Sequence, residues 1–425
     1  MKGQIITAQK GTKDVLPNES YKWHYLEDKI KEVTRLYNIK EVRTPMFEAT
    51  ELFLRGVGDS TDIVNKEMYT FLDKGDRSIT LKPEGTAGVV RSYIENGLFN
   101  EPQPIKCYYV SSIFRYERPQ KGRLREHHQF GIEYFGSNSP LADAEVIMVA
   151  VDFIKSFGIK NVSVNINSIG NEGDRENYKA KLRDYFKNQL NDLCSDCQNR
   201  YNTNVLRLLD CKVDMEKEVV KNAPSILNSL SEESMRHFEA VKKELTVKDI
   251  KYTVNDKIVR GLDYYTGTVF EIIGDDIEGP SKVICGGGRY NNLVEELGGK
   301  PEPAVGFGMG LERVLMLLDE FKISIPEPAG VDVYVISSDK VVNALEVANE
   351  LRERGVSAEV DLLERGLNAQ LNYANKIGAK FVMFASDNSF IELKNMKNGV
   401  QEPMTFEEAV EFIKFGKRKA KYIMA

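Results

Sequence analysis

The stretch FRYERPQKGRLREHHQFGIE, residues 114–133, places four arginines, a lysine and two histidines between two hydrophobic segments. The flanking segments, IKCYYVSSIFRYE and HHQFGIEYFG, both have the composition of β-strands. A loop of about ten residues joins them, which is too short for a crossover helix. We therefore predict two neighbouring antiparallel strands with a positively charged loop between them.

The chain has 425 residues, of which 42% are hydrophobic and 29% charged, and a formal net charge of −6. This length predicts a multidomain globular protein, and the acidic balance argues against a uniformly basic nucleic-acid binder. Neither the first residues nor any later segment has the apolar length of a signal sequence or a membrane span, so we expect a cytoplasmic protein without membrane contact. Five cysteines, an odd number, argue against a disulfide framework.

The N-terminal part mixes helices and strands. Apolar residues recur at helical spacing from Trp23 to Leu36 and predict a long helix, with Asn18 or Ser20 as its cap. The segment IKEVRTP then predicts a strand that stops at Pro45, and SPLADAEVIMVAVDFIKSFG predicts a helix.

Strand patterns are interrupted once, by a polar and helix-patterned span at 171–251. We interpret this span as a helical insertion into a core formed by residues 1–170 and 252–325. Beyond a proline-bearing linker, residues 330–425 alternate short strands with helices. This alternation predicts a small α/β domain with a mostly parallel sheet.

The charged loop offers a site for an anion. Arg115 and Glu117 are two residues apart on an extended segment, so their side chains point to one face. The guanidinium fork suits a phosphate, and a neighbouring glutamate can accept a hydrogen bond from an exocyclic amine such as that of adenine. For this segment alone, a surface ion pair is the alternative.

The segment PAVGFGMGLERVL adds glycines at Gly306, Gly308 and Gly310 and a cation at Arg313. A bare backbone on a strand would let a flat ring approach closely. A dinucleotide fingerprint is set aside, because the third glycine comes one residue early and Glu327 stands between two prolines about twenty residues on. A glycine-rich strand that merely packs against a helix remains the alternative.

Two further segments supply polar groups. RGLDYYTGTVFE contributes Arg260 and two adjacent tyrosines, and KPEGTAG contributes a glutamate and a threonine. The residues that offer donors and acceptors for both nitrogens of an imidazole are Glu84, Thr86, Gln129, Tyr264 and Tyr265.

The segment CSDCQNRYNTNVLRLLDC contains Cys194, Cys197 and Cys211, which invites a zinc interpretation. No histidine or cysteine lies near enough in the sequence to be a fourth ligand, and His237 is a distant candidate. We therefore expect no structural metal, and three buried or partly exposed thiols instead.

Taken together, these motifs resemble those of the histidyl-tRNA synthetases, a family of class II aminoacyl-tRNA synthetases, over essentially the whole chain. FRYERPQKGR and GFGMGLERVL resemble the two arginine motifs of the class, and the strand that reaches Pro45 resembles its dimer-forming motif. RGLDYYTGTVFE and GGGRYNNLVEELGG resemble signatures of the histidine enzymes. The resemblance implies an antiparallel catalytic sheet flanked by helices, a helical insertion and a C-terminal α/β anticodon-binding domain.

The resemblance also implies a ligase that uses ATP with Mg²⁺ to activate L-histidine and then charges tRNA(His), working as a homodimer. It assigns ATP binding to Arg115, Glu117, Arg123 and Arg313. It assigns histidine binding to Glu84, Thr86, Gln129, Glu133, Tyr264 and Tyr265. It assigns catalysis to Arg260, at the α-phosphate, and to Arg115, Arg313 and Gln129.

Two rival functions differ in class. A non-catalytic relative that regulates the first enzyme of histidine biosynthesis would lack the C-terminal domain and would degrade RGLDYY, and both are present here. A binding module that senses uncharged tRNA would lose the ATP arginines, yet Arg115, Arg260 and Arg313 all remain. The sequence therefore favours the enzyme.

Overall fold

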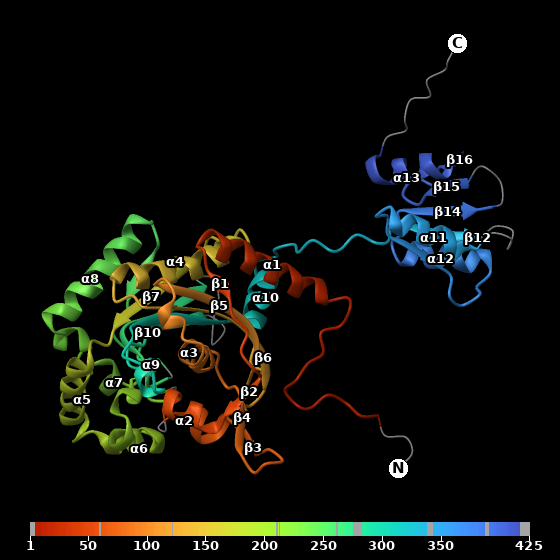
Figure 1. Ribbon diagram of the computed structural model, residues 1–425. Helices are drawn as coiled ribbons and strands as arrows, with labels where there is room; N and C mark the ends of the chain where they lie inside the picture. The colour runs from red at the N-terminus through yellow and green to blue at the C-terminus, as the bar shows by residue number, and fades with distance from the viewer. Residues whose placement is uncertain are drawn as a thin grey trace. The chain divides into compact units, whose positions relative to one another are not determined.

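The computed structural model divides the chain into two compact units, Met1–Ile325 and Pro326–Ala425, which we describe separately (Figure 1). Parts of the charged loop and of the C-terminal segment, such as Lys121 and residues 417–425, lie outside the described residues. The structure describes residues 5–58, 61–120, 122–209, 211, 213–260, 262–274, 283–337, 343–386 and 391–416.

The first unit is built around a sheet of eight strands, counted over the described residues (Figure 1). Its inner pairings are antiparallel, whereas the strand at each edge runs parallel to its neighbour. The predicted antiparallel sheet is confirmed, with parallel pairings added at its edges. The strands in spatial order are β1 (Lys40–Glu41), β5 (Ile105–Phe114), β6 (Glu126–Phe135), β11 (Ala304–Gly310), β10 (Val283–Arg289), β9 (Thr266–Gly274), β7 (Val162–Ser168) and β8 (Tyr252–Val254).

The hairpin predicted from residues 114–133 is confirmed, because β5 and β6 pair antiparallel along their full lengths. The strand predicted to end at Pro45 is much shorter than expected. After β1, the amide of Val42 still donates to the carbonyl of Tyr108 at 2.8 Å, and then the chain leaves the sheet. Proline has no amide to continue such a ladder.

Four helices pack their apolar sides against one face of the sheet. Aromatic residues link the layers: the ring of Phe130 lies 5.1 Å from that of Phe153 and 5.4 Å from that of Phe307. This face therefore holds the main core. The helices are α1 (Ser20–Leu36), α4 (Pro140–Lys155), α8 (Glu232–Val247) and α10 (Leu311–Glu320).

The predicted start of α1 is wrong in one detail. Its N-cap residue is Glu19, which makes no side-chain capping hydrogen bond, so neither Asn18 nor Ser20 is the cap. The hydroxyl of Ser20 instead donates to the carbonyl of Pro17 at 3.2 Å. By contrast, α4 begins directly after Ser139, whose hydroxyl accepts a backbone amide hydrogen bond of 3.2 Å.

A second apolar core lies on the opposite face and joins α3 (Thr86–Glu95) and α9 (Leu293–Glu296) to helices that follow β7. The helices between β7 and β8, besides α8, are α5 (Glu172–Phe186), η3 (Leu190–Asp192), α6 (Ser195–Thr203), η4 (Val205–Leu208), α7 (Glu218–Lys221) and η5 (Ile226–Ser229). Smaller elements beside α3 are β2 (Phe47–Ala49), α2 (Thr50–Val57), η1 (Ile63–Glu67), β3 (Tyr69–Leu72), β4 (Ser78–Leu81) and η2 (Leu98–Asn100).

The second unit has a five-stranded sheet in the order β13-β12-β14-β15-β16. A mostly parallel sheet was expected, but only the pairings of β12 with β13 and β14 are parallel among the described strands. The chain returns from β14 through short hairpin connections without a crossover helix, which makes the last two pairings antiparallel. The elements are β12 (Val333–Ser337), α11 (Ala344–Glu353), β13 (Ala358–Val360), α12 (Leu367–Lys376), β14 (Phe381–Ala385), β15 (Ile391–Asn395), β16 (Gln401–Met404) and α13 (Phe406–Phe415).

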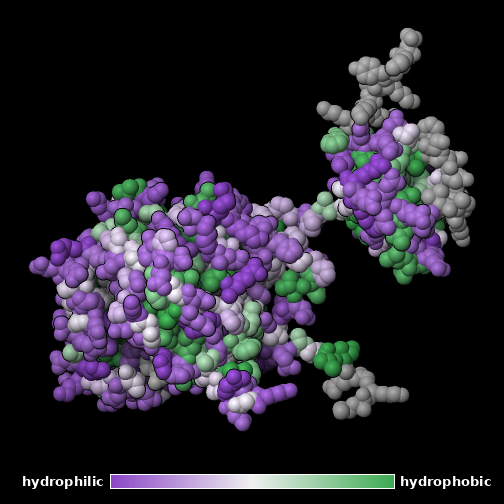
Figure 2. All heavy atoms as spheres, viewed as in Figure 1, coloured by the Kyte–Doolittle hydropathy of each residue, from purple (hydrophilic) through white to green (hydrophobic). Residues whose placement is uncertain are grey.

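Figure 2 shows hydrophilic residues predominating on the face in view, with hydrophobic residues scattered among them. Scattered apolar residues of this kind are normal on a folded protein surface. In the part of the chain that the structure describes, none of the helices combines the length and the apolar composition that crossing a membrane requires.

Candidate active site

Strand β6 divides its side chains between the main core and the opposite face of the sheet. Phe130, Ile132 and Tyr134 are buried in the core beneath α4. Because successive residues of a strand alternate, Gln129 and Glu133 point to the other face. Both residues that were predicted on this strand therefore share one face.

The neighbouring strand carries glycine where side chains would enter this face. Gly306 and Gly308 of β11 lie opposite Glu133 and Gly131 of β6. A Cβ atom on Gly308 would lie 2.5 Å from Nε2 of Gln129, and a Cβ atom on Gly306 would collide with the Glu133 carboxylate. The glycines thus make room for polar side chains of the site itself.

Arg260 reaches the same face from the loop before β9. Its φ of +64° is a left-handed conformation that is uncommon for residues with a side chain. Its guanidinium lies over Gly286 of β10, where any Cβ atom would collide with it. Nη1 of Arg260 donates to Oε1 of Glu271 at 2.5 Å, and its carbonyl accepts from Nη1 of Arg207 at 3.0 Å. Its Nε is buried and has no hydrogen-bond partner among the described residues.

Glu84 and Glu133 are buried carboxylates beside the first turn of α3. Glu84 accepts hydrogen bonds from the amides of Thr86 at 2.7 Å and Ala87 at 2.6 Å. The Thr86 hydroxyl donates to Oε1 of Glu133 at 2.7 Å, and the Tyr290 hydroxyl donates to Oε2. Burial raises the pKa of Glu133 to about 8, although the hydrogen bonds from Tyr290 and Thr86 oppose this shift.

Tyr264 and Tyr265 are buried next to these carboxylates, with ring centroids 4.7 Å apart. Tyr264 also meets the ring of Tyr290 edge-on at 5.5 Å. Burial raises the pKa of Tyr265 to about 12, with the charge of Arg260 opposing the shift. The strand expected from residue 260 onward begins only at Thr266, so the tyrosines sit in the loop before it.

Two tyrosines of this cluster were not identified from the sequence. The hydroxyl of Tyr109 donates to Oε1 of Gln129 at 3.0 Å, and Tyr290 holds Glu133. Tyr109 lies opposite Gly131 in the β5–β6 register, so the alternation within IKCYYVSSIF was an available signal. Tyr290 directly follows the glycine run of β10, which marked its place but not its partner.

The predicted phosphate-binding residues lie where the hairpin leaves the sheet. Because β5 ends at Phe114, Arg115 and Glu117 follow the strand and do not share one of its faces, which corrects the expectation. Nη1 of Arg115 lies 3.9 Å from Oε1 of Glu117, whereas Nε of Arg123 approaches Oε2 at 3.0 Å. Nε of Arg115 donates to the carbonyl of Pro83 at 2.7 Å, which ties the loop to the start of α3.

Arg313, in the first turn of α10, adds to this group of cations. Its Nη1 donates to a backbone carbonyl of β10 at 2.6 Å. Burial lowers the pKa of Arg313, and so does the charge of Arg123. Arg115 and Arg260 act in the same direction. Burial, followed by the charge of Arg115, also lowers the pKa of His127 to about 3. A bound polyanion would offset this mutual repulsion.

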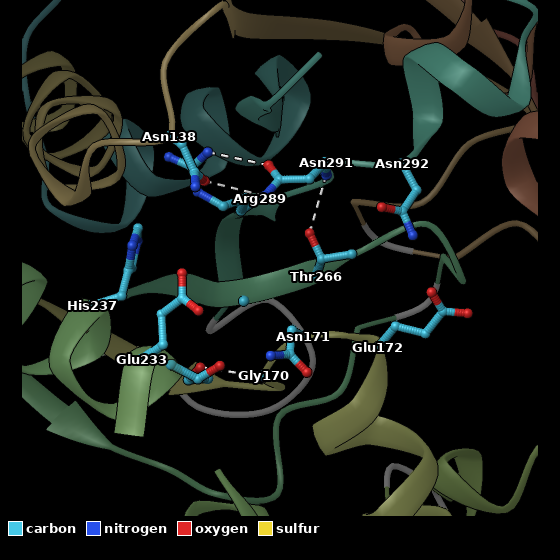
Figure 3. A pocket seen from close by; sticks show the side chains of 13 residues that line it. Asn138, Gly170, Asn171, Glu172, Glu233, His237, Thr266, Arg289, Asn291 and Asn292 are labelled. Atoms are coloured by element: carbon cyan, nitrogen blue, oxygen red, sulfur yellow. Dashed lines mark hydrogen bonds between the residues drawn. The ribbon is translucent and has the colours of Figure 1, made fainter. Parts of the chain in front are cut away.

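A separate pocket of about 190 Å³ lies between the insertion and β9 (Figure 3). None of the residues predicted for the site lines it. Nε2 of His237 lies 3.3 Å from Asp143, which is also ion-paired with Arg289, and Arg289 donates to Asn291 at 3.2 Å (Figure 3). Burial alone would raise the pKa of Asp143, but Arg289 and His237 lower it below its usual value. One wall of this pocket is therefore an internally paired ionic network.

Comparisons with known proteins agree on one family. A model of histidyl-tRNA synthetases matches residues 11–314, and a model of anticodon-binding domains matches residues 331–415. The histidine–tRNA ligase of Clostridium novyi is 52% identical over 402 residues, 93% of this chain and 95% of that protein. That of Thermoanaerobacter pseudethanolicus is 50% identical over 416 residues, 96% and 99% of the two chains. The crystal structure of apo S. aureus histidyl-tRNA synthetase is 39% identical, with a TM-score of 0.81, and the match covers 96% of this chain and 100% of that one.

A sheet face lined by arginines and buried carboxylates, in a chain that also carries an anticodon-binding unit, defines an aminoacyl-tRNA synthetase. The family model covers most of the chain, and relatives near 50% identity extend over nearly all of it. The chain belongs to the histidyl-tRNA synthetase family. The resemblance found in the sequence is confirmed.

Replacement of Glu133 by glutamine should change how stability depends on pH. The folded-state pKa of Glu133 is raised to about 8, so its contribution to stability is complete below pH about 4.5 and is lost as the pH rises to 8. Glutamine does not titrate, so the free energy of unfolding of Glu133→Gln relative to wild type should rise across this range, by at most about 1.4 kcal/mol per pH unit.

Urea unfolding of both proteins between pH 5 and pH about 8 measures this difference. Glu232→Gln, an exposed change on α8, serves as the control for net charge. A difference that stays constant over the range would contradict the prediction.

Proposed function

We propose that the chain is a histidine–tRNA ligase. It activates L-histidine with ATP to form histidyl-adenylate and pyrophosphate, and then transfers histidine to the 3′-terminal adenosine of tRNA(His). The observation that carries the proposal is the placement of a buried Glu133–Thr86 pair beside a cluster of arginines on one sheet face. Relatives named histidine–tRNA ligase match nearly the whole chain and support the same conclusion.

The histidine substrate lies against the polar face of β6 and the first turn of α3. The carboxyl and hydroxyl groups there offer acceptors and donors to the two ring nitrogens of histidine. Another amino acid would leave these buried groups unpaired, so discrimination of about 10⁴ to 10⁵ is reachable without editing. The residues proposed to bind histidine are Glu84, Thr86, Gln129, Glu133, Tyr264 and Tyr265.

ATP binds where the charged hairpin meets α10. Arg115 and Arg313 hold its phosphates, and Glu117 accepts a hydrogen bond from the amino group of adenine. Arg123 contacts ATP and holds the Glu117 carboxylate in place through its 3.0 Å ion pair. ATP enters as its magnesium complex, in which phosphate oxygens are ligands of the metal.

In the first step, a carboxylate oxygen of histidine attacks the α-phosphorus, and the bond to pyrophosphate breaks. Negative charge grows on the equatorial oxygens, where Arg260 acts together with Arg115 and Arg313. Gln129 orients the reacting carboxylate through its amide. In the second step, the 3′-hydroxyl of the tRNA attacks the adenylate carbonyl, and the departing phosphate accepts the proton.

The remaining parts of the chain serve the tRNA. The second unit, which the anticodon-binding model matches, binds the anticodon of tRNA(His), and the insertion contacts the acceptor arm. The protein acts in the cytoplasm as a homodimer. These assignments rest on the resemblance of the motifs and on the order of the units along the chain.

Pyrophosphate exchange into ATP, measured with each of the twenty amino acids, magnesium present and tRNA absent, tests the proposed function first. Exchange should occur with histidine alone, because only its ring pairs with the buried polar groups. If folded protein gives no exchange, repeating the assay with tRNA decides the matter. Absence of exchange in both assays would reject the enzyme in favour of a binding module.

Replacement of Arg260 by alanine should lower the rate of histidine-dependent exchange by at least about 10², because a preorganised donor at the α-phosphate is lost. Arg236→Ala removes an exposed arginine from α8 and should leave exchange unchanged. Near-normal exchange by a folded Arg260→Ala protein would remove this arginine from the mechanism.

Light scattering tests the homodimer. The resemblance of the strand ending at Pro45 to a dimer-forming motif predicts about twice the chain mass of 48.2 kDa at micromolar concentration. A mass equal to one chain would reject the dimer.

A further inference from the structure

Three cysteines of the insertion converge with one carboxylate. Cys194 directly precedes α6, Cys197 lies in its first turn, and Cys211 and Asp214 follow η4. One potential ligand atom from each residue lies within 4.8 Å of all the others. Cys197, Cys211 and Asp214 are buried, and Cys194 is partly exposed.

The separations in this cluster fit one tetrahedral ion. Zinc–sulfur bonds of about 2.3 Å place the sulfurs of a tetrahedral site about 3.8 Å apart. The sulfurs of Cys194 and Cys211 are 3.7 Å apart. A disulfide would need about 2.0 Å, and four donors this close together cannot enclose a cluster of several irons.

The two halves of the cluster have the same construction. Cys194 and Cys197 are three residues apart, as are Cys211 and Asp214. The amide of Cys197 is a hydrogen-bond partner of the Cys194 sulfur, and the amides of Val213 and Asp214 are partners of the Cys211 sulfur. Amides directed at sulfur favour the thiolate, which is the form that binds metals.

Asp214 supplies the fourth donor that the sequence did not reveal. His237, the distant candidate, instead faces Asp143 at 3.3 Å. Oδ2 of Asp214 accepts the amide of Cys194 at 2.8 Å, and Oδ1 lies 2.7 Å from Nζ of Lys217. Three thiolates and a carboxylate exceed the charge of a divalent ion, and the Lys217 ammonium offsets part of that excess.

The elements around the cluster are short: α6 has nine residues, and η4 and α7 have four each. Helices of this length are not stable by themselves in water. A shared ion would join the start of α6 to the segment that follows η4. That segment matters for the site, because Arg207 of η4 donates to the carbonyl of Arg260 at 3.0 Å.

We propose that Cys194, Cys197, Cys211 and Asp214 bind one Zn²⁺ ion, which stabilises the insertion. On binding, the three thiols release their protons and form zinc–sulfur bonds, and Asp214 contributes one carboxylate oxygen. No group is oxidised or reduced. The site takes zinc in preference to calcium or magnesium, because thiolates are soft ligands.

Metal analysis of the full chain tests this proposal. Protein purified without chelator should contain about one zinc ion per chain. Cys197→Ser and Asp214→Ala should each lower the zinc content to below about a tenth of the wild-type value and lower the Tm. Cys107→Ala changes a buried cysteine of β5 outside the cluster and should keep the full zinc content.

Because a variant could lose zinc by misfolding, the wild-type chain is also tested with cobalt. Zinc is removed with a chelator and Co²⁺ is added; the visible absorption of tetrahedral cobalt and a thiolate charge-transfer band are expected. Folded wild-type protein that takes up neither zinc nor cobalt would overturn the proposal. Two fewer free thiols than the five cysteines of the chain, with no metal, would replace it with a Cys194–Cys211 disulfide.

Discussion

Strand β6 carries the main core on one face and the candidate active site on the other. Phe130 and Ile132 are held by the helices above them, and Gln129 and Glu133 alternate with these residues. A slip of one residue in the register would exchange the two faces, so the packing of the core fixes the position of the polar side chains. The burial of aromatic residues, a nonspecific force in itself, thereby gives the site its precision.

The polar face holds groups that are poorly satisfied without a ligand. Glu133 is buried with a raised pKa, and several arginines lower the pKa of Arg313 and of His127. Backbone carbonyls and the Glu117 carboxylate hold some of these cations in place. Fixed charges of this kind need little reorganisation when negative charge develops on a substrate. The proposed chemistry and the electrostatics of the free site are two aspects of the same arrangement.

The sequence predicted the parts of this structure that depend on local spacing. The β5–β6 hairpin followed from two strand-like segments and a short loop, and α4 followed from its cap at Ser139. The sequence failed where distant segments meet. Tyr109 and Tyr290 become partners of the site only through strand register, and the partly antiparallel sheet of the second unit depends on hairpin returns. Asp214 escaped notice because a lone aspartate has no metal signature until cysteines fold against it.

The glycine floor of the site has a consequence for substitution. Gly286 and Gly308 leave space that the side chains of Arg260 and Gln129 occupy, so even a methyl group there would displace a polar side chain. A compound that lies on this floor contacts mostly backbone, which point mutations cannot alter in chemical character. Residues that could evict such an inhibitor by growing larger would also disturb the arginine beside them. Routes to resistance through the floor are therefore narrow, and they are wider at the charged loop, where side chains make the contacts.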